Sequence, residues 1–356
     1  MKFQSALLAL LFFVTLSTPG YAKYEYDADE DAPPSPSDQA IGMVTGPKTG
    51  TYITFGKDIA REAAKTGVKV DVYDSKGSID NIKRITSKEK VGLAIVQSDV
   101  LGFLSRSRSQ QSMAIAHKLR LVAPLYDEEV HILANRDIKT VEDLRGKRVV
   151  VGSEDSGSTI TAENVFNILG ITPSNVYETD PPHGVIAVLE GDADAMVFVG
   201  GKPVKMFKNM EDLAKITTGP NAGKLDQVHF LALNDQRLLR EYKPATITHT
   251  DYGFVPENVP TIAVTAMLIT YDYTLKTGEY YRLRCNNMAK LVKSLYDNMD
   301  ELKASGHPKW NEVDLNADVG DWKRDSCTQK VLSEMGVHED DNSALEKDLL
   351  GVIKGK

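Results

Sequence analysis

The residues best suited to hold a ligand lie in the stretch Thr45–Gly56, between a predicted strand and a predicted helix. The apolar run Ala40–Val44 precedes it, and a helical pattern follows over Tyr52–Lys65. A strand that turns through glycines into a helix presents free backbone N–H groups at the positive end of the helix dipole. We therefore predict that this turn binds an anionic or carbonyl oxygen; a left-handed turn that needs glycine is the alternative. The predicted contacts are Thr49, Gly50, Thr51 and Tyr52.

Two more polar clusters follow the next two predicted strands. Ser78 and Asn81 come after the second strand, and Gln97 and Asp99 come after the third. Ligands of open parallel sheets bind beyond the carboxyl ends of the strands, so we expect these four side chains to face the same ligand. Helix capping is the alternative explanation for Ser78 and Asp99. Asp99 would meet a ligand ammonium group, which favours an amino acid over a dicarboxylate.

A second set of hydroxyl- and glycine-rich strand ends lies further along the chain. One follows the strand Lys147–Gly152, and the other follows the strand Ala193–Val199. Two sets of this kind could face each other across a cleft, one on each of two lobes. The predicted contacts on the second side are Ser156, Gly157, Ser158, Thr159, Gly200 and Gly201.

The elements that position these clusters alternate between strand and helix. This alternation predicts an α/β fold with a parallel sheet, and about 330 mature residues favour two lobes over a single core. Two short strands, Arg120–Leu125 and Glu129–Ala134, are interpreted as the crossing to the second lobe, and Pro260–Thr270 as the return strand. Gly278–Ser305 is predicted as one long amphipathic helix. The predicted lobes are residues 40–126 plus 260–356, and residues 127–259, with hinges at both crossings.

The first 39 residues are interpreted as export and spacer segments. Met1–Ala22 carries one cation, an apolar run of about 11 residues and small residues before Lys23, which is typical of a secretory signal cleaved after Ala22. An uncleaved anchor is the alternative. Residues 23–39 are acidic and proline-rich, which predicts a disordered linker. We therefore expect a periplasmic protein.

The net charge limits the class of binding partner, and the cysteine content predicts a disulfide. The full chain has a formal net charge of −8, and loss of Lys2 with the signal makes it −8 − 1 = −9. An acidic chain without a basic patch makes nucleic acid an unsuitable partner. Cys285 and Cys327 are the two cysteines, and in an exported protein such a pair usually forms a disulfide; two free thiols are the alternative.

Catalytic and metal motifs are not evident. The segment Glu154–Gly157 superficially resembles a nucleophile loop, but its flanking glycines are missing and His183 has no supporting spacing as a base. The seven histidines are scattered, without the further ligands that a metal motif requires. We therefore predict no metal, no cofactor and no enzymatic activity, and keep an exported hydrolase as a minor alternative.

The ordered set of motifs resembles the TAXI proteins, the extracytoplasmic solute receptors of one class of tripartite (TRAP) transporters. The first-lobe motifs are T-G-P-K-T-G-T-Y at Thr45–Tyr52, G-S-I-D-N at Gly77–Asn81 and L-A-I-V-Q-S-D at Leu93–Asp99. The later ones are L-V-A-P-L-Y, E-V-H-I-L, D-L-R-G-K-R-V-V-V-G, S-G-S-T and E-G-D-A-D-A-M-V-F-V-G-G, between Leu121 and Gly201. The resemblance covers about residues 40–300, and beyond His307 the chain departs from the family pattern.

This resemblance implies a type II periplasmic-binding-protein fold, in which two lobes close like a Venus flytrap about hinge strands. It also implies a small carboxylate or amino-acid ligand, such as glutamate or 2-oxoglutarate, and delivery to the integral-membrane subunits of a transporter. We expect a monomer. The alternative is a ligand-sensing binding protein that feeds a membrane signalling receptor. For the tail after Gly306, a cap on the first lobe is the simplest hypothesis.

Overall fold

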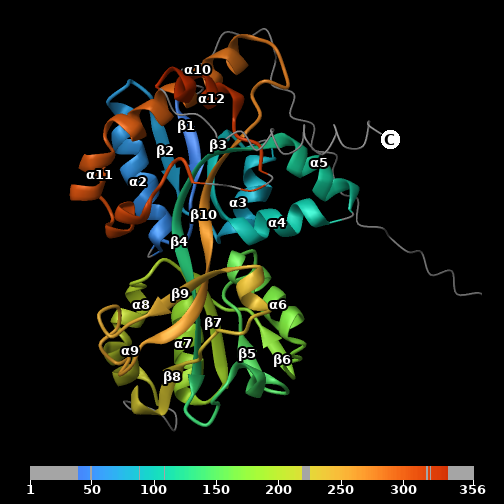
Figure 1. The fold of residues 1–356 in the computed structure, drawn as a ribbon, viewed down its shortest axis with the longest axis vertical. Helices are drawn as coiled ribbons and strands as arrows, with labels where there is room; N and C mark the ends of the chain where they lie inside the picture. The colour runs from blue at the N-terminus through green and yellow to red at the C-terminus, as the bar shows by residue number, and fades with distance from the viewer. Residues whose placement is uncertain are drawn as a thin grey trace, which may run out of the picture.

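The computed structural model describes residues 39–48, 50–87, 89–107, 109–218, 225–317, 320 and 322–335. The predicted signal Met1–Ala22, residues 23–38 of the predicted linker and the tail from 336 onward lie outside the described residues. The described residues form two α/β lobes stacked along the long axis of the molecule (Figure 1). Among them, no helix combines the length and the apolar character needed to cross a membrane.

The first lobe is built on three parallel strands in the order β2–β1–β3. These are β1 (Ile41–Val44), β2 (Val70–Tyr73) and β3 (Val91–Gln97), and every residue of β3 is buried, as its continuous apolar run predicts. Helices connect and cover them because their apolar residues recur on one face. The helices are α2 (Thr51–Ala64), α3 (Ser78–Ile85), α4 (Ser98–Arg106) and α5 (Gln110–Lys118).

The second lobe repeats this plan with the order β6–β5–β7. Its strands are β5 (Arg148–Val150), β6 (Asn175–Tyr177) and β7 (Ala195–Gly200). A capping box at Thr140 and Asp143 begins the short helix η1 (Val141–Leu144). The other helical segments are α6 (Gly157–Leu169), α7 (Pro181–Glu190), α8 (Lys205–Lys208), α9 (Met210–Ile216), η2 (Leu225–Gln227) and η3 (Leu238–Arg240).

Two long antiparallel strands, β4 (Leu119–Asn135) and β10 (Val259–Tyr271), run through both lobes (Figure 1). The prediction of two separate strands within β4 is wrong: the intervening Asp127 and Glu128 pair with Thr265 and Val264 and keep the ladder continuous. Each lobe thus adds one antiparallel strand to its three parallel ones, because β10 pairs with β3 and β4 pairs with β7. Two edge strands, β8 (Val228–Phe230) and β9 (Lys243–Ile247), pair with β4 and β10.

The apolar cores lie on either side of these crossings. In β4, Tyr126 packs in a first-lobe cluster and Val130 in a second-lobe cluster. In β10, Val264 packs in the second lobe and Ala266 in the first. This division supports the two-lobe α/β fold. We keep the predicted crossing after Tyr126 as a proposal, and we propose that the return crossing lies between Val264 and Ala266, a few residues beyond the predicted boundary at Pro260.

The C-terminal part wraps around the first lobe. The predicted single helix is wrong, because it divides into α10 (Glu279–Asp297) and α11 (Met299–Ser305). At the junction the Asn298 side chain donates to the Ser294 carbonyl at 2.8 Å, and such local bonds compete with helix continuation. The chain then forms η4 (Pro308–Glu312) and α12 (Ser326–Glu334). The predicted disulfide between Cys285 and Cys327 is present and joins α10 to α12.

Replacing both cysteines with serine should lower the free energy of unfolding by roughly 4 kcal/mol, because the bridge closes a loop between residues 42 apart. Urea denaturation of the oxidised wild type and of the Cys285→Ser, Cys327→Ser variant measures this difference. The variant should not respond to a reducing agent, which controls for effects of the reagent. A wild-type transition that does not move when dithiothreitol is added would contradict the prediction.

Candidate ligand-binding site

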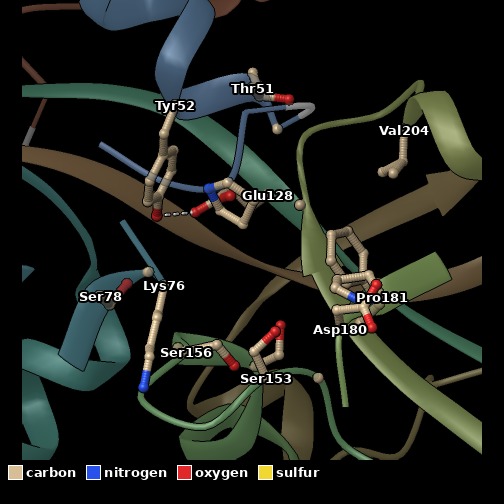
Figure 2. A pocket seen from close by; sticks show the side chains of 18 of the residues that line it. Thr51, Tyr52, Lys76, Ser78, Glu128, Ser153, Ser156, Asp180, Pro181 and Val204 are labelled. Atoms are coloured by element: carbon tan, nitrogen blue, oxygen red, sulfur yellow. Dashed lines mark hydrogen bonds between the residues drawn. The ribbon is translucent and has the colours of Figure 1, made fainter. Parts of the chain in front are cut away.

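A cavity of about 370 Å³ lies where the two lobes face each other (Figure 2). Its walls come from the strand ends of both lobes and from one residue of β4. The first lobe and β4 contribute Pro47, Gly50, Thr51, Tyr52, Lys76, Gly77, Ser78, Gln97 and Glu128. The second lobe contributes Gly152, Ser153, Ser156, Gly157, Ser158, Asp180, Pro181, Pro182, Phe198, Gly200, Val204, Lys205 and Met206.

The structure brings most of the predicted site residues together around this cavity. Those that line it are Gly50, Thr51, Tyr52, Ser78, Gln97, Ser156, Gly157, Ser158 and Gly200. Thr49 lies outside the described residues. Four predicted contacts do not line the cavity, which corrects their placement: Asn81, Asp99, Thr159 and Gly201. Whether the lining residues contact a ligand stays a prediction.

Each of these four residues has a structural role instead. The buried Asn81 amide donates to the carbonyls of Thr45 and Ile95, at 2.6 and 2.7 Å, and so ties α3 to the ends of two strands. The Thr159 hydroxyl donates to the Val151 carbonyl. Gly201 lies so close to Tyr126 that an added Cβ would be 2.7 Å from its ring. These three residues stabilise the walls of the cavity, but they are not part of its lining.

Asp99 lies on the far side of the contact between α4 and α6. Its carboxylate accepts hydrogen bonds from Thr161 at 2.8 Å and from Tyr242 at 3.5 Å, and burial raises its pKa to about 6. Asp99 belongs to a separate, open groove that Arg106 and Arg240 also line. An ammonium group in the main cavity would therefore need another acidic partner.

The buried acid in the lining of the main cavity is Glu128, which the sequence analysis missed because it lies in an apolar strand. The Tyr52 hydroxyl donates to Glu128 Oε2 at 2.5 Å inside the cavity (Figure 2). Burial raises the pKa of Glu128 to about 8, with the charges of Glu129 and Asp99 adding to the rise. The signal that could have revealed it is the acidic run Asp127–Glu129 in the middle of an otherwise apolar strand.

The neighbouring Glu129 has a different role because it is paired. It accepts a bond from the Lys309 ammonium at 2.8 Å and from the Lys202 backbone N–H at 2.9 Å. Lys309 is only 2% exposed and also binds Glu312 at 2.7 Å. The two carboxylates raise the pKa of Lys309, although burial lowers it. The C-terminal segment therefore reaches β4 where this strand passes between the lobes, beyond the cap on the first lobe that the sequence suggested.

The two lobes touch directly beside the cavity. Gly157 at the start of α6 packs against Gln97, so that an added Cβ would lie 1.7 Å from Gln97 Oε1. The Asp155 carbonyl accepts the backbone N–H groups of Ile79 and Asp80, both at 3.1 Å. The Asp155 carboxylate also binds Lys83 at 2.6 Å. These contacts describe a closed arrangement, in which Asp155 occupies the N-terminus of α3.

A buried chain of hydrogen bonds fixes the loop that carries Val204, Lys205 and Met206. The Val204 backbone N–H donates to the Tyr252 hydroxyl, which in turn lies 2.9 Å from Nε2 of His131. Burial lowers the pKa of His131 to about 3, so the ring is neutral. His131 Nδ1 lies 2.9 Å from the Glu129 carbonyl and donates to it, which leaves Nε2 to accept from Tyr252.

The chemistry of the lining suits binding. The Ser156 hydroxyl has no hydrogen-bond partner among the described residues, and His183 pairs with Asp180 instead. The same part of the chain holds no group of three or more His, Cys, Asp or Glu placed for a metal ion. The cavity is lined by both acidic and basic side chains. Glu128 is buried, whereas Lys76 and Lys205 are exposed.

Comparison with known proteins identifies similar sequences and folds. The model of the NMT1-like family matches residues 43–321. MatC from Rhodopseudomonas palustris with bound malate is 15% identical, with a TM-score of 0.48 over 85% of this chain and 98% of that chain. The sulfonate-binding protein SsuA from Methylobacillus flagellatus is 11% identical, with a TM-score of 0.46 over 84% and 95%. AbpA from Streptococcus pneumoniae bound to L-arginine is 14% identical, with a TM-score of 0.45 over 78% and 96%.

The Glu128→Gln variant should change how stability depends on pH. The folded protein holds a proton on Glu128 up to a pKa of about 8, whereas an unfolded glutamate releases it near its ordinary value of about 4.3. The wild type therefore gains stability from this proton at low pH and loses it as pH rises, by up to about 1.4 kcal/mol per unit between pH 5 and 8. Urea denaturation at four pH values measures the difference between the two proteins.

Glutamine should remove this slope because it cannot titrate and can still accept the Tyr52 bond. The matched control is the Glu154→Gln variant, because Glu154 lies outside the cavity lining and its side chain is 74% exposed; the stability profile of this variant should run parallel to that of the wild type. Parallel profiles of the wild type and Glu128→Gln would mean that Glu128 is ionised in the folded protein.

Proposed function

The chain belongs to the NMT1-like family, and from this premise we propose that it is an exported solute-binding protein for a small carboxylate or amino acid. The observation that carries the proposal is the 370 Å³ cavity with one wall from each lobe. This volume lies within the range of small-molecule sites, which combine apolar surface with a few polar groups. A ligand held between both walls would favour the closed arrangement over an open one, because it gains contacts only there.

Two helix starts support an anionic end of the ligand. The 14-residue α2 begins after Gly50 and the 13-residue α6 begins after Ser156, and neither helix has a side-chain cap. Both starts line the cavity, so their free N–H groups and dipoles suit a carboxylate oxygen. No arginine lines this cavity among the described residues, which favours recognition by backbone groups over a bidentate clamp.

We further propose that the lobes close about β4 and β10, and that the loaded protein meets the membrane subunits of a TRAP-type transporter as a monomer. The hinge proposal rests on the core clusters, which change lobe between Tyr126 and Val130 in β4 and between Val264 and Ala266 in β10. The transporter proposal rests on the motif resemblance, and the predicted signal before Lys23 supports a periplasmic location.

Catalysis has no support from the arrangement of side chains. A serine nucleophile needs a base within hydrogen-bond reach, and His183 is bonded to Asp180 and exposed. Ser156 at the start of α6 therefore fits better as a binding group. Gly157, which follows it, packs against Gln97 and closes the cavity on that side.

A thermal-shift screen of amino acids and of di- and tricarboxylates should identify at least one compound that raises the melting temperature. Binding to the folded state alone stabilises by about 2.7 kcal/mol when the ligand is at 100 times its dissociation constant. Small-angle scattering with that compound should show a smaller radius of gyration. If no compound in either class stabilises the protein, this proposed ligand class is wrong.

The Gly157→Ala variant should weaken binding of the same compound by about tenfold, the equivalent of 1.4 kcal/mol. The new Cβ would lie 1.7 Å from Gln97 Oε1 and 2.9 Å from Ser78 Oγ, so either the lobes separate or Gln97 turns into the cavity. Gly253→Ala is the matched control, because nothing lies within 4 Å of its added Cβ. Calorimetry that gives wild-type affinity for Gly157→Ala would show that this contact is not needed for binding.

A further inference from the structure

We infer that Glu128 selects the charge of the ligand by binding a protonated amino group, so that amino acids bind in preference to the corresponding 2-oxo acids. This inference rests on the proposed function, because it assigns one end of the ligand that the cavity would hold.

The position of Glu128 is the first argument. The residue is 3% exposed and lies at the middle of β4, where the strand passes from one lobe to the other. Its Oε2 atom accepts from Tyr52 at 2.5 Å, and the carboxyl group is part of the cavity lining (Figure 2). One oxygen is therefore fixed, and the other is available to a group in the cavity.

Among the described residues, no lysine, arginine or histidine forms an ion pair with this carboxyl group, and Lys309 acts on it only from a distance. The charged and titratable groups around it are Tyr52 on α2, Tyr126 and Glu129 on β4, Asp99 on α4 and Lys309 on η4. Lys309 is already held by Glu129 at 2.8 Å and by Glu312 at 2.7 Å. Lys76 and Lys205 line the cavity, but both are exposed and neither forms a described ion pair with Glu128.

A buried acid in these surroundings is protonated at neutral pH, and its pKa is raised to about 8. A ligand ammonium group would supply the missing positive charge and lower that pKa. The exchange is balanced: the neutral Glu128 acid loses its proton to solvent, and the resulting carboxylate accepts a hydrogen bond from the ligand ammonium. At pH 7, below the pKa of Glu128 in the empty cavity, most of one proton should leave for each amino acid bound.

The cavity also offers different groups to the two charged ends of an amino acid. The free N–H groups of α2 and α6 suit the carboxylate of an amino acid. Glu128 suits its ammonium group, which is the role that Asp99 cannot fill from its separate groove. A 2-oxo acid has a carbonyl oxygen in place of the ammonium group. This oxygen can accept a hydrogen bond from the neutral Glu128 acid, but it carries no positive charge to pair with a Glu128 carboxylate.

Matched pairs of ligands test the inference. L-glutamate and 2-oxoglutarate, and L-alanine and pyruvate, differ at the group that should meet Glu128. Calorimetry at pH 7 in phosphate and in Tris, which have different ionisation enthalpies, measures the protons released with each compound. The wild type should bind at least one amino acid about tenfold or more tightly than its 2-oxo partner, with release of close to one proton.

The Glu128→Gln variant should lose that proton release and bind the amino acid about tenfold or more weakly, while 2-oxo acid affinity stays within about threefold. Asp180→Asn is the matched control, because Asp180 is the other acid in the lining and is exposed; this variant should keep the proton release. Circular dichroism confirms that each variant is folded, and the proton count of the wild type needs no variant.

The outcomes separate the inference from the proposed function. Tight binding of a 2-oxo acid, or of an amino acid without proton release, would overturn the role of Glu128 and leave the solute-binding function in place. Proton release that persists in Glu128→Gln but is lost in Asp180→Asn would assign the amino group to Asp180 and overturn the inference. If no amino acid, no 2-oxo acid and no other compound of the full screen binds, both the role of Glu128 and the proposed solute-binding function are wrong.

Discussion

The continuous ladder between β4 and β10 is the constraint on which the rest of the structure depends. Every backbone N–H and C=O of a buried strand needs a partner, and these two strands pair between Leu119 and Glu129 and between Ala263 and Tyr271, with two register shifts along the way. The same strands complete the sheets of both lobes, through β3 on one side and β7 on the other. The lobes are therefore joined by hydrogen-bonded strands, and the cavity beside them has one fixed edge.

Placing an acidic run at the middle of this ladder gives three neighbouring carboxylates three different environments. Asp127 binds Lys243 and Thr265 and is partly exposed. Glu128 is enclosed with Tyr52, and Glu129 is paired with Lys309. Because successive residues of a strand point to opposite faces, the backbone sends Glu128 toward the cavity while its neighbours turn away from it. A buried pair such as Glu129–Lys309 is costly to break, since either partner alone would be an uncompensated charge.

The C-terminal segment holds this arrangement from outside. Trp310 is fully buried, stacks on Phe55 with ring centroids 4.5 Å apart and donates to Asp58 at 2.9 Å. The preceding residue, Lys309, thereby reaches Glu129, and the disulfide anchors the helix that follows to α10. The same short helix thus contacts both α2 and β4, so a change at η4 should affect the position of both elements.

The sequence by itself determined the α/β class and most of the strand ends that line the cavity, because burial and helix patterning are local properties of the chain. Gly50, Ser78, Gln97 and Ser156 could be predicted as neighbours for this reason. Only the tertiary structure decided which side chains face inward. Asn81 is turned to two backbone carbonyls, Asp99 lies behind the α4–α6 contact, and Glu128 comes from a strand that reads as apolar. The direction of a side chain depends on which elements pack beside it, and sequence spacing does not contain that information.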